Sequence, residues 1–286
     1  RLLVLIGFLI GGLLLTTLVS GLLMLASGMS LADIMKMAQS GMGALSPGLT
    51  RGLLATQPLL IFILPGLLFG LVFYQGKFLN GLNLDVHPGW QLSILGIFFL
   101  MAAYPLVNLS FLANESIPLP AWADKFESQA EDTLKAILTM NTPVIFIFNL
   151  IIIAILPGIG EELIFRGILQ KHIGLLFKSP VAAIWIAAFI FSAIHLQFEG
   201  FLPRMALGAV LGYLYYWTGN LWVPIIAHAF NNGIQVALIY VTGMDISNFD
   251  EESSDQLEWW MIPLSITIMY LIYRSILKNR KVLEQT

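Results

Sequence analysis

Two adjacent carboxylates and a guanidinium lie inside a strongly apolar part of this chain. Glu161, Glu162 and Arg166 follow the run Val144–Leu156, which contains no ionisable residue. A charged side chain at bilayer depth costs at least about 2.5–3.5 kcal/mol on insertion scales, so it needs a partner, a water-filled cavity or a function. Three charges within six positions therefore indicate a functional site.

Helical geometry assigns these charges different directions. Residues four apart share a helix face, so Glu162 and Arg166 are expected to form an ion pair. Adjacent helical residues point about 100° apart, so Glu161 and Glu162 are not expected to face one common site. We expect Glu161 to face a cavity instead.

Two of the four histidines lie in predicted membrane spans, and they are the best candidates for further site residues. His195 is in one span, and His228 is in another, where Asn232 follows it four residues later on the same helix face. A single intramembrane histidine is more often a structural hydrogen-bonding residue. Two histidines, an asparagine and three charges in neighbouring spans favour a site. His87 and His172 fall in expected loops and receive no role.

Chain distances to the expected turns predict how deep these residues lie. Glu161 and His195 are each 17 residues from Lys178, which starts the expected hairpin turn, so antiparallel helices would place them at one depth. His228 is about eight residues beyond the turn expected at Gly219–Asn220. At 1.5 Å per residue it would lie shallower, unless that turn is recessed or the helices tilt.

The composition is that of a membrane protein. Of 286 residues, 58% are hydrophobic and 11% are charged, whereas soluble domains contain roughly 25% charged residues. The net charge of -3 and the lack of interleaved basic and aromatic residues exclude a nucleic-acid partner. The absence of cysteine excludes disulfides and a thiol nucleophile. Any metal must be bound by His, Asp, Glu or Asn.

The hydrophobic pattern predicts an all-α polytopic membrane protein with about eight transmembrane helices. A span needs about 20 mostly apolar residues, and eight segments meet this loosely: Leu2–Ala26, Leu53–Tyr74, Trp90–Ala113, Thr142–Gln170, Pro180–Gln197, Phe201–Trp217, Leu221–Gly243 and Trp259–Leu277. Ser30–Leu45 is expected to be an interfacial helix, and Ala121–Met140 a helix outside the membrane. Asp245–Glu258 is expected to be a solvated acidic loop, and Gly208-x-x-x-Gly212 to allow close helix packing.

An even number of spans places both termini on one side of the membrane. Basic residues are more frequent on that side, with Arg1, Lys77, Lys171, Lys178, Arg274, Lys278, Arg280 and Lys281 there, and Lys36, Arg51, Lys125, Lys135 and Arg204 opposite. This bias favours cytoplasmic termini. We expect an integral protein of a bacterial inner membrane. Because the chain begins with Arg1 rather than Met, we expect its natural amino terminus to have been trimmed or processed.

Three motifs in consecutive spans resemble a known family. The CAAX-protease and bacteriocin-processing family of intramembrane proteases, also called CPBP or Abi, has motifs similar to these: Glu161-Glu162-x-x-x-Arg166, Phe191-x-x-x-His195 and His228-x-x-x-Asn232. The similarity extends over about Thr142–Thr242, and the flanking spans match only in being hydrophobic. The resemblance implies an eight-helix bundle and a peptidase whose polar cavity opens to the cytoplasmic side.

The resemblance also implies roles for the site residues. Glu161 and His195 would activate a water that attacks the scissile carbonyl, while His228 and Asn232 would stabilise the oxyanion and the expected ion pair would support the site. Glu161, His195 and His228 could instead hold zinc with a water in the open position. The cofactor is thus either none or zinc, and we favour the metal-independent reading. The expected partners are membrane lipid and a peptide or membrane-protein substrate.

The resemblance divides the chain into three regions. We expect N-terminal transmembrane helices with interfacial and extramembrane helices in residues 1–141, a catalytic core in residues 142–243, and an acidic loop with a C-terminal span in residues 244–286. The chain lacks the motifs His-Glu-x-x-His, Gly-x-Ser-Gly and Gly-x-Gly-Asp, which excludes zincin-like, rhomboid-like and presenilin-like sites. Two alternatives stay open: a proton- or ion-coupled transporter, and a non-catalytic immunity or scaffold protein of the same family.

Overall fold

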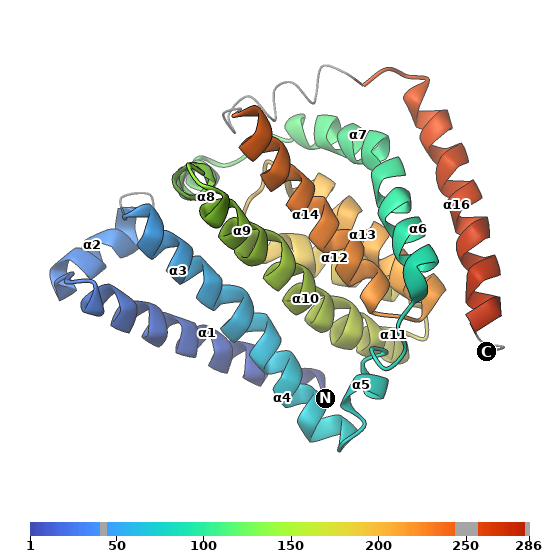
Figure 1. The fold of residues 1–286 in the computed structure, drawn as a ribbon, viewed down its shortest axis with the longest axis horizontal. Helices are drawn as coiled ribbons and strands as arrows, with labels where there is room; N and C mark the ends of the chain where they lie inside the picture. Colours follow the sequence, from blue (N-terminus) through green and yellow to red (C-terminus); the bar gives the residue numbers. More distant parts are fainter. Residues whose placement is uncertain (41–44, 244–256, 284–286) are drawn as a thin grey trace.

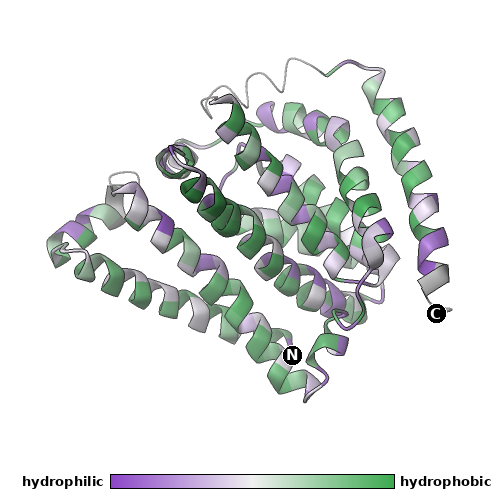
Figure 2. Ribbon diagram, in the orientation of Figure 1, coloured by the Kyte–Doolittle hydropathy of each residue, from purple (hydrophilic) through white to green (hydrophobic). Residues whose placement is uncertain are grey.

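The computed structural model describes residues 1–40, 45–243 and 257–283, and all regular elements within these ranges are helices (Figure 1). The predicted fold class, an all-α polytopic membrane protein, is confirmed. Within the described ranges, six helices are long and apolar enough to cross a membrane: Leu2–Ala26, Pro47–Tyr74, Gly89–Glu115, Pro143–Phe177, Trp222–Thr242 and Met261–Arg280. The outer helices α1 (Leu2–Ala26) and α16 (Met261–Leu283) are hydrophobic over most of their length (Figure 2), as a lipid-facing surface requires.

The other two expected spans are shorter or less apolar. Helix α12 (Pro180–Ala193) has 14 residues, about 21 Å at 1.5 Å per residue, against about 30 Å of bilayer core. It ends before the expected boundary at Gln197, and Leu196, with φ 55°, is in the left-handed region. Helix α13 (Phe201–Thr218) carries Arg204 near its start and packs against α12.

Serine or threonine followed by proline starts three of the helices. A hydroxyl that accepts from a backbone N–H three residues later caps the first turn, and proline fits the first helical position. The capping pairs are Ser46 with Leu49 N (3.4 Å), Thr142 with Ile145 N (3.3 Å) and Ser179 with Ala182 N (3.2 Å). The turn predicted at Lys178 is therefore present between α11 and α12.

The long span at Pro143–Phe177 is divided by two widened, π-helical segments. Its parts are α9 (Pro143–Asn149), η3 (Leu150–Ile155), α10 (Leu156–Glu162), η4 (Leu163–Gln170) and α11 (Lys171–Phe177). A third widened segment, η2 (Pro58–Ile63), lies between α3 (Pro47–Gln57) and α4 (Leu64–Tyr74). Such segments occur frequently at functional sites. Here they flank α10, which carries both glutamates.

The remaining helices lie mostly around this centre. Helix α2 (Leu31–Ser40) is present where an interfacial helix is expected, and α8 (Ala121–Leu138) where a helix outside the membrane is expected. The others are α5 (Phe78–Gly81), α6 (Gly89–Ala102), α7 (Tyr104–Glu115) and α14 (Trp222–Thr242). Most of the acidic loop predicted at Asp245–Glu258 lies outside the described residues.

The turn between α13 and α14 is recessed under the α5–α6 connection. Leu221 N donates to Asn83 O (3.0 Å), and Asn83 Nδ2 donates to Gly219 O (2.7 Å). Asn220 Nδ2 donates to Val86 O (2.7 Å), and Leu221 is fully buried. Of the two ways in which His228 could reach the depth of Glu161, a recessed turn is therefore present. The α5–α6 connection therefore covers the start of α14.

A buried arginine joins α3 to the end of α8. Arg51 Nε donates to Asn149 Oδ1 (3.1 Å), and its Nη2 donates to the carbonyls of Ile137 (2.8 Å) and Thr139 (2.9 Å). Cations favour the C-terminal end of a helix, where carbonyl groups lack helical partners. Arg51 therefore closes the C-terminus of α8 and fixes that helix to the bundle.

Replacing this arginine is expected to destabilise the protein. Arg51→Met keeps most of the side-chain length but removes every donor, and a buried acceptor without its donor costs about 1–3 kcal/mol. We expect a clearly lower melting temperature in detergent. Lys125→Met, at an exposed position of α8, is the control and should melt like the wild type. Equal melting of the two variants would contradict this role of Arg51.

Candidate active site

The ion pair predicted within one helix face is present and fully buried. Glu162 Oε1 and Arg166 Nη1 are 2.6 Å apart, and the two side chains are 0% and 1% exposed. Arg166 Nη2 also donates to Gly208 O (2.7 Å), and the guanidinium lies 5.0 Å from the centre of the Phe191 ring. The guanidinium of Arg166 thus interacts with a carboxylate, a backbone carbonyl and an aromatic ring.

Two glycines on α13 allow this carbonyl contact. Arg166 and Gln170 are four residues apart on one helix, and they donate to the carbonyls of Gly208 and Gly212, also four apart (2.7 and 3.0 Å). A Cβ at Gly212 would lie 2.9 Å from atoms of Gln170 and Ile184. The spacing predicted to permit close packing therefore also exposes two backbone acceptors.

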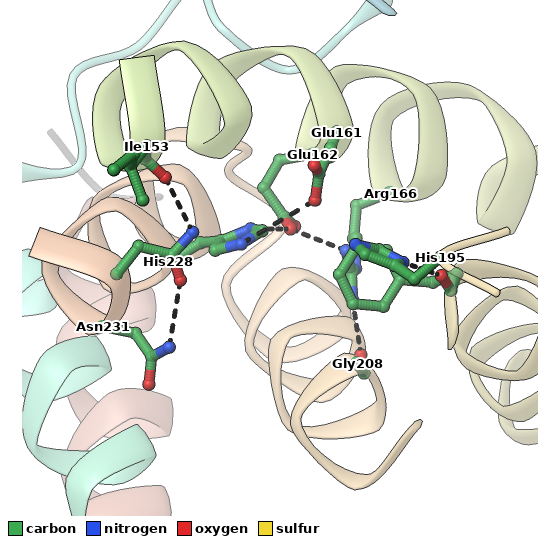
Figure 3. A network of polar contacts seen from close by, with 10 residues as sticks. Ile153, Glu161, Glu162, Arg166, His195, Gly208, His228 and Asn231 are labelled. Carbon is green, nitrogen blue, oxygen red and sulfur yellow. Dashed lines mark hydrogen bonds and ion pairs between the residues drawn. The ribbon is translucent and has the colours of Figure 1, made fainter. Parts of the chain in front are cut away.

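The imidazole of His228 faces both glutamates (Figure 3). Its Nδ1 is 2.8 Å from Glu162 Oε1, and its Nε2 is 3.8 Å from Glu161 Oε2. The expectation that the adjacent glutamates do not face one site is therefore wrong for this imidazole. The two nitrogens lie on different edges of the ring, so long side chains that leave α10 in different directions each reach one of them.

A chain of amides fixes the orientation of Asn232. Asn232 Nδ2 donates to Ile153 O (3.1 Å), and its Oδ1 accepts from Asn231 Nδ2 (3.1 Å), while Asn231 Oδ1 accepts from the Tyr104 hydroxyl (2.7 Å). Proline has no N–H, so Pro157 cannot donate to the carbonyl of Ile153 four residues earlier. Asn231 and Tyr104 were not predicted as site residues from the sequence. Asn231 could have been found, because it lies on the polar face of α14.

His195 lies just beyond the end of α12. Its Nδ1 is 2.7 Å from Phe191 O, which leaves Nε2 for other partners. Within the described part of the chain, no hydrogen bond or ion pair joins His195 to Glu161. The structure instead brings Glu161 next to His228.

One cavity of about 1100 Å³ is lined by Glu161, His195, His228 and Asn232. These residues come from α10, from the α12–α13 connection and from α14. Glu162 and Arg166 are not part of its lining, but Glu162 contacts the lining residue His228. Four of the six predicted site residues therefore line a single cavity.

The cavity also contains polar groups that the sequence reading did not assign to a site. Arg204 donates to the backbone and side-chain oxygens of Gln197 (3.0 and 2.8 Å), and both residues line the cavity. Glu127 of α8 accepts from the backbone N–H groups of Phe198 and Glu199. The sequence-based prediction uses Arg204 only for the membrane orientation, although a charge in a predicted span also indicates a functional site.

His172, which was predicted to lie in a loop, is buried. His172 lies in α11, is 8% exposed, and has its Nδ1 2.8 Å from Ile168 O. The helix extends past the expected end at Gln170, so the predicted loop is wrong there. His87 is exposed in the α5–α6 connection, as expected.

The residues considered for zinc do not form a ligand set as they are placed. No group of three His, Asp or Glu side chains close enough to share a metal ion occurs in the described ranges. His228 has a carboxylate at each ring nitrogen, and His195 has no contact to Glu161. Tetrahedral zinc needs three protein ligands around one point. The donor geometry therefore does not fit zinc.

Comparison with known proteins places the site in a family segment. Residues 143–234 match the family described as Rce1-like, type II CAAX prenyl endopeptidase. The uncharacterized protein YpbD of Bacillus subtilis (strain 168) is 39% identical over 84 residues, which cover 28% of this chain and 40% of YpbD. The alignment thus spans less than half of that relative. No solved structure matches the chain.

The matched segment contains all three motifs, from Glu161 through Asn232. The resemblance to the CAAX-protease (CPBP) family is thereby confirmed for the segment that carries the predicted site residues.

Proposed function

We propose that this protein is an intramembrane endopeptidase that hydrolyses a peptide bond with a water activated by Glu161. The observation that carries the proposal is the convergence of Glu161, His195, His228 and Asn232 on one cavity, inside the segment that matches the CAAX-protease family. A transporter would need a pathway through the bundle, whereas these four residues surround one cavity.

Glu161 is the proposed general base. Its carboxylate is 12% exposed, lines the cavity, and has the imidazole of His228 at 3.8 Å. It takes a proton from water while the water oxygen bonds to the scissile carbonyl carbon. General base catalysis by a positioned side chain contributes about 10²–10⁴-fold.

His228 and Asn232 are the proposed oxyanion donors. In this scheme His228 is an imidazolium, with a proton on each ring nitrogen. Its Nδ1 donates to Glu162 Oε1, which also accepts from Arg166, and its Nε2 can donate on the cavity side. Asn232 uses one amide N–H for Ile153 and retains a second. A donor aimed at a developing oxyanion is worth about 2.7–4 kcal/mol.

His195 completes the proposed cycle. The Phe191 carbonyl holds its Nδ1, so Nε2 is available to orient the attacking water. When the tetrahedral intermediate collapses, the proton on Glu161 passes to the leaving amine nitrogen and the C–N bond breaks. The scheme uses only side chains of this chain, because the donor geometry does not fit zinc.

Glu161→Gln is expected to lower kcat by at least about 100-fold, since the amide cannot take the proton from water. The two side chains have nearly the same size, so melting in detergent should stay at the wild-type value. Hydrolysis of a quenched peptide library by purified protein is the measurement. His87→Ala, at an exposed histidine, is the control, and wild-type turnover by Glu161→Gln would refute the assigned base.

Arg166→Met is expected to lower both stability and turnover. It leaves the buried Glu162 carboxylate without its cation, and removing one partner of a buried pair costs about 3–5 kcal/mol. The double variant Glu162→Gln with Arg166→Met should regain part of the melting temperature but not the turnover, because His228 Nδ1 then lacks a charged acceptor.

The control for this pair is Lys135→Met. Lys135 and Glu131 are also four residues apart on one helix, but their side chains are 42% and 49% exposed. Exposed pairs contribute about 0–1 kcal/mol, so melting should change little. A buried pair that behaves like this exposed one would argue against a structural role for Glu162.

Tyr104→Phe is expected to reduce kcat about 3- to 10-fold with little change in KM, the effect of losing one neutral hydrogen bond. The hydroxyl acts through Asn231 on the orientation of Asn232. In an Asn232→Ala background, Tyr104→Phe should therefore have no further effect on kcat. Equal losses in both backgrounds would show that Tyr104 acts by another route.

A further inference from the structure

The cavity opens at the end of the bundle opposite to both chain termini. Helix α1 runs from the amino terminus to the far end, and the connections then alternate between the two ends (Figure 1). The α4–α6, α11–α12 and α13–α14 connections lie at the end of the termini. The α7–α8 and α12–α13 connections lie at the other end.

The mouth of the cavity is formed by these last two connections. Its lining includes the exposed residues Glu115, Ile117 and Pro118 after α7, and Glu199 between α12 and α13. The Glu127 carboxylate of α8 accepts hydrogen bonds from backbone N–H groups of the α12–α13 connection. No lining residue comes from the connections at the end of the termini among the parts of the chain that the structure describes.

Basic residues distinguish the two ends. The end with the termini carries Arg1, Lys77, Lys171, Lys178, Arg274, Lys278, Arg280 and Lys281, and the mouth end carries Lys36, Arg51, Lys125, Lys135 and Arg204. Two of the five at the mouth end point inward, since Arg51 closes α8 and Arg204 lies in the cavity wall. Lysine and arginine near span ends mark the cytoplasmic side.

We infer that the cavity opens to the extracytoplasmic side, so that its substrates are peptide segments exposed outside the cytoplasm. The substrate part of this inference rests on the proposed peptidase function. Cytoplasmic termini are expected from the basic residues, and a cavity open to the cytoplasm is implied by the family resemblance. The two expectations exclude each other in this fold. The distribution of basic residues favours cytoplasmic termini, so the cavity opens on the opposite, extracytoplasmic side.

Single-cysteine labelling tests the inference, because the chain has no cysteine of its own. Ser116→Cys places a thiol beside the mouth, and Leu79→Cys places one at the end of the termini, where Leu79 is 53% exposed. Neither substitution changes a basic residue. Right-side-out spheroplasts are treated with a membrane-impermeant maleimide, before and after lysis, and total thiol reactivity is measured in denaturant.

We expect Ser116→Cys to react in intact spheroplasts and Leu79→Cys to react only after lysis. The reverse pattern, or equal labelling of both positions before lysis, would overturn the inference. If Ser116→Cys fails to accumulate, Ser128→Cys on the exposed face of α8 replaces it. Labelling does not depend on hydrolysis, whereas the peptide assay uses solubilised protein without sides, so each idea can fail without the other.

Discussion

One buried carboxylate holds the site together. Glu162 Oε1 binds both Arg166 Nη1 (2.6 Å) and His228 Nδ1 (2.8 Å), and so joins α10, η4 and α14 at a point without solvent. Taking such charges out of water costs several kcal/mol per ion, which is offset only when the geometry and the further hydrogen bonds are good. Arg166 meets this condition through the exposed carbonyl of Gly208. The catalytic proposal depends on this network because it sets the direction of the His228 ring.

The helices around the network are irregular where the site requires it. Pro157 frees the carbonyl of Ile153, which then fixes the amide of Asn232. Widened helical segments flank α10, and the recessed turn before α14 brings His228 down to the glutamates. Two of these irregularities have a local chemical cause: Pro157 lacks an N–H, and a covering segment binds the turn before α14.

The fold class and the buried ion pair could be predicted from the sequence, because hydrophobic span length and four-residue spacing are local properties. The contact of Glu161 with His228 could not, since it depends on how deep α14 starts, and that is set by hydrogen bonds from Asn83, far away in the chain. The role of Asn231 was hidden for the same reason, because its partner Tyr104 lies on another helix. The face on which the cavity opens required the path of the whole chain.

The most direct test of the account is an experimental structure of the Glu161→Gln protein with a bound peptide. The account predicts that the scissile carbonyl oxygen lies about 2.7–3.2 Å from His228 Nε2 or Asn232 Nδ2, with the carbonyl carbon facing residue 161. A peptide bound outside the cavity, or a His228 ring turned away from both glutamates, would contradict it.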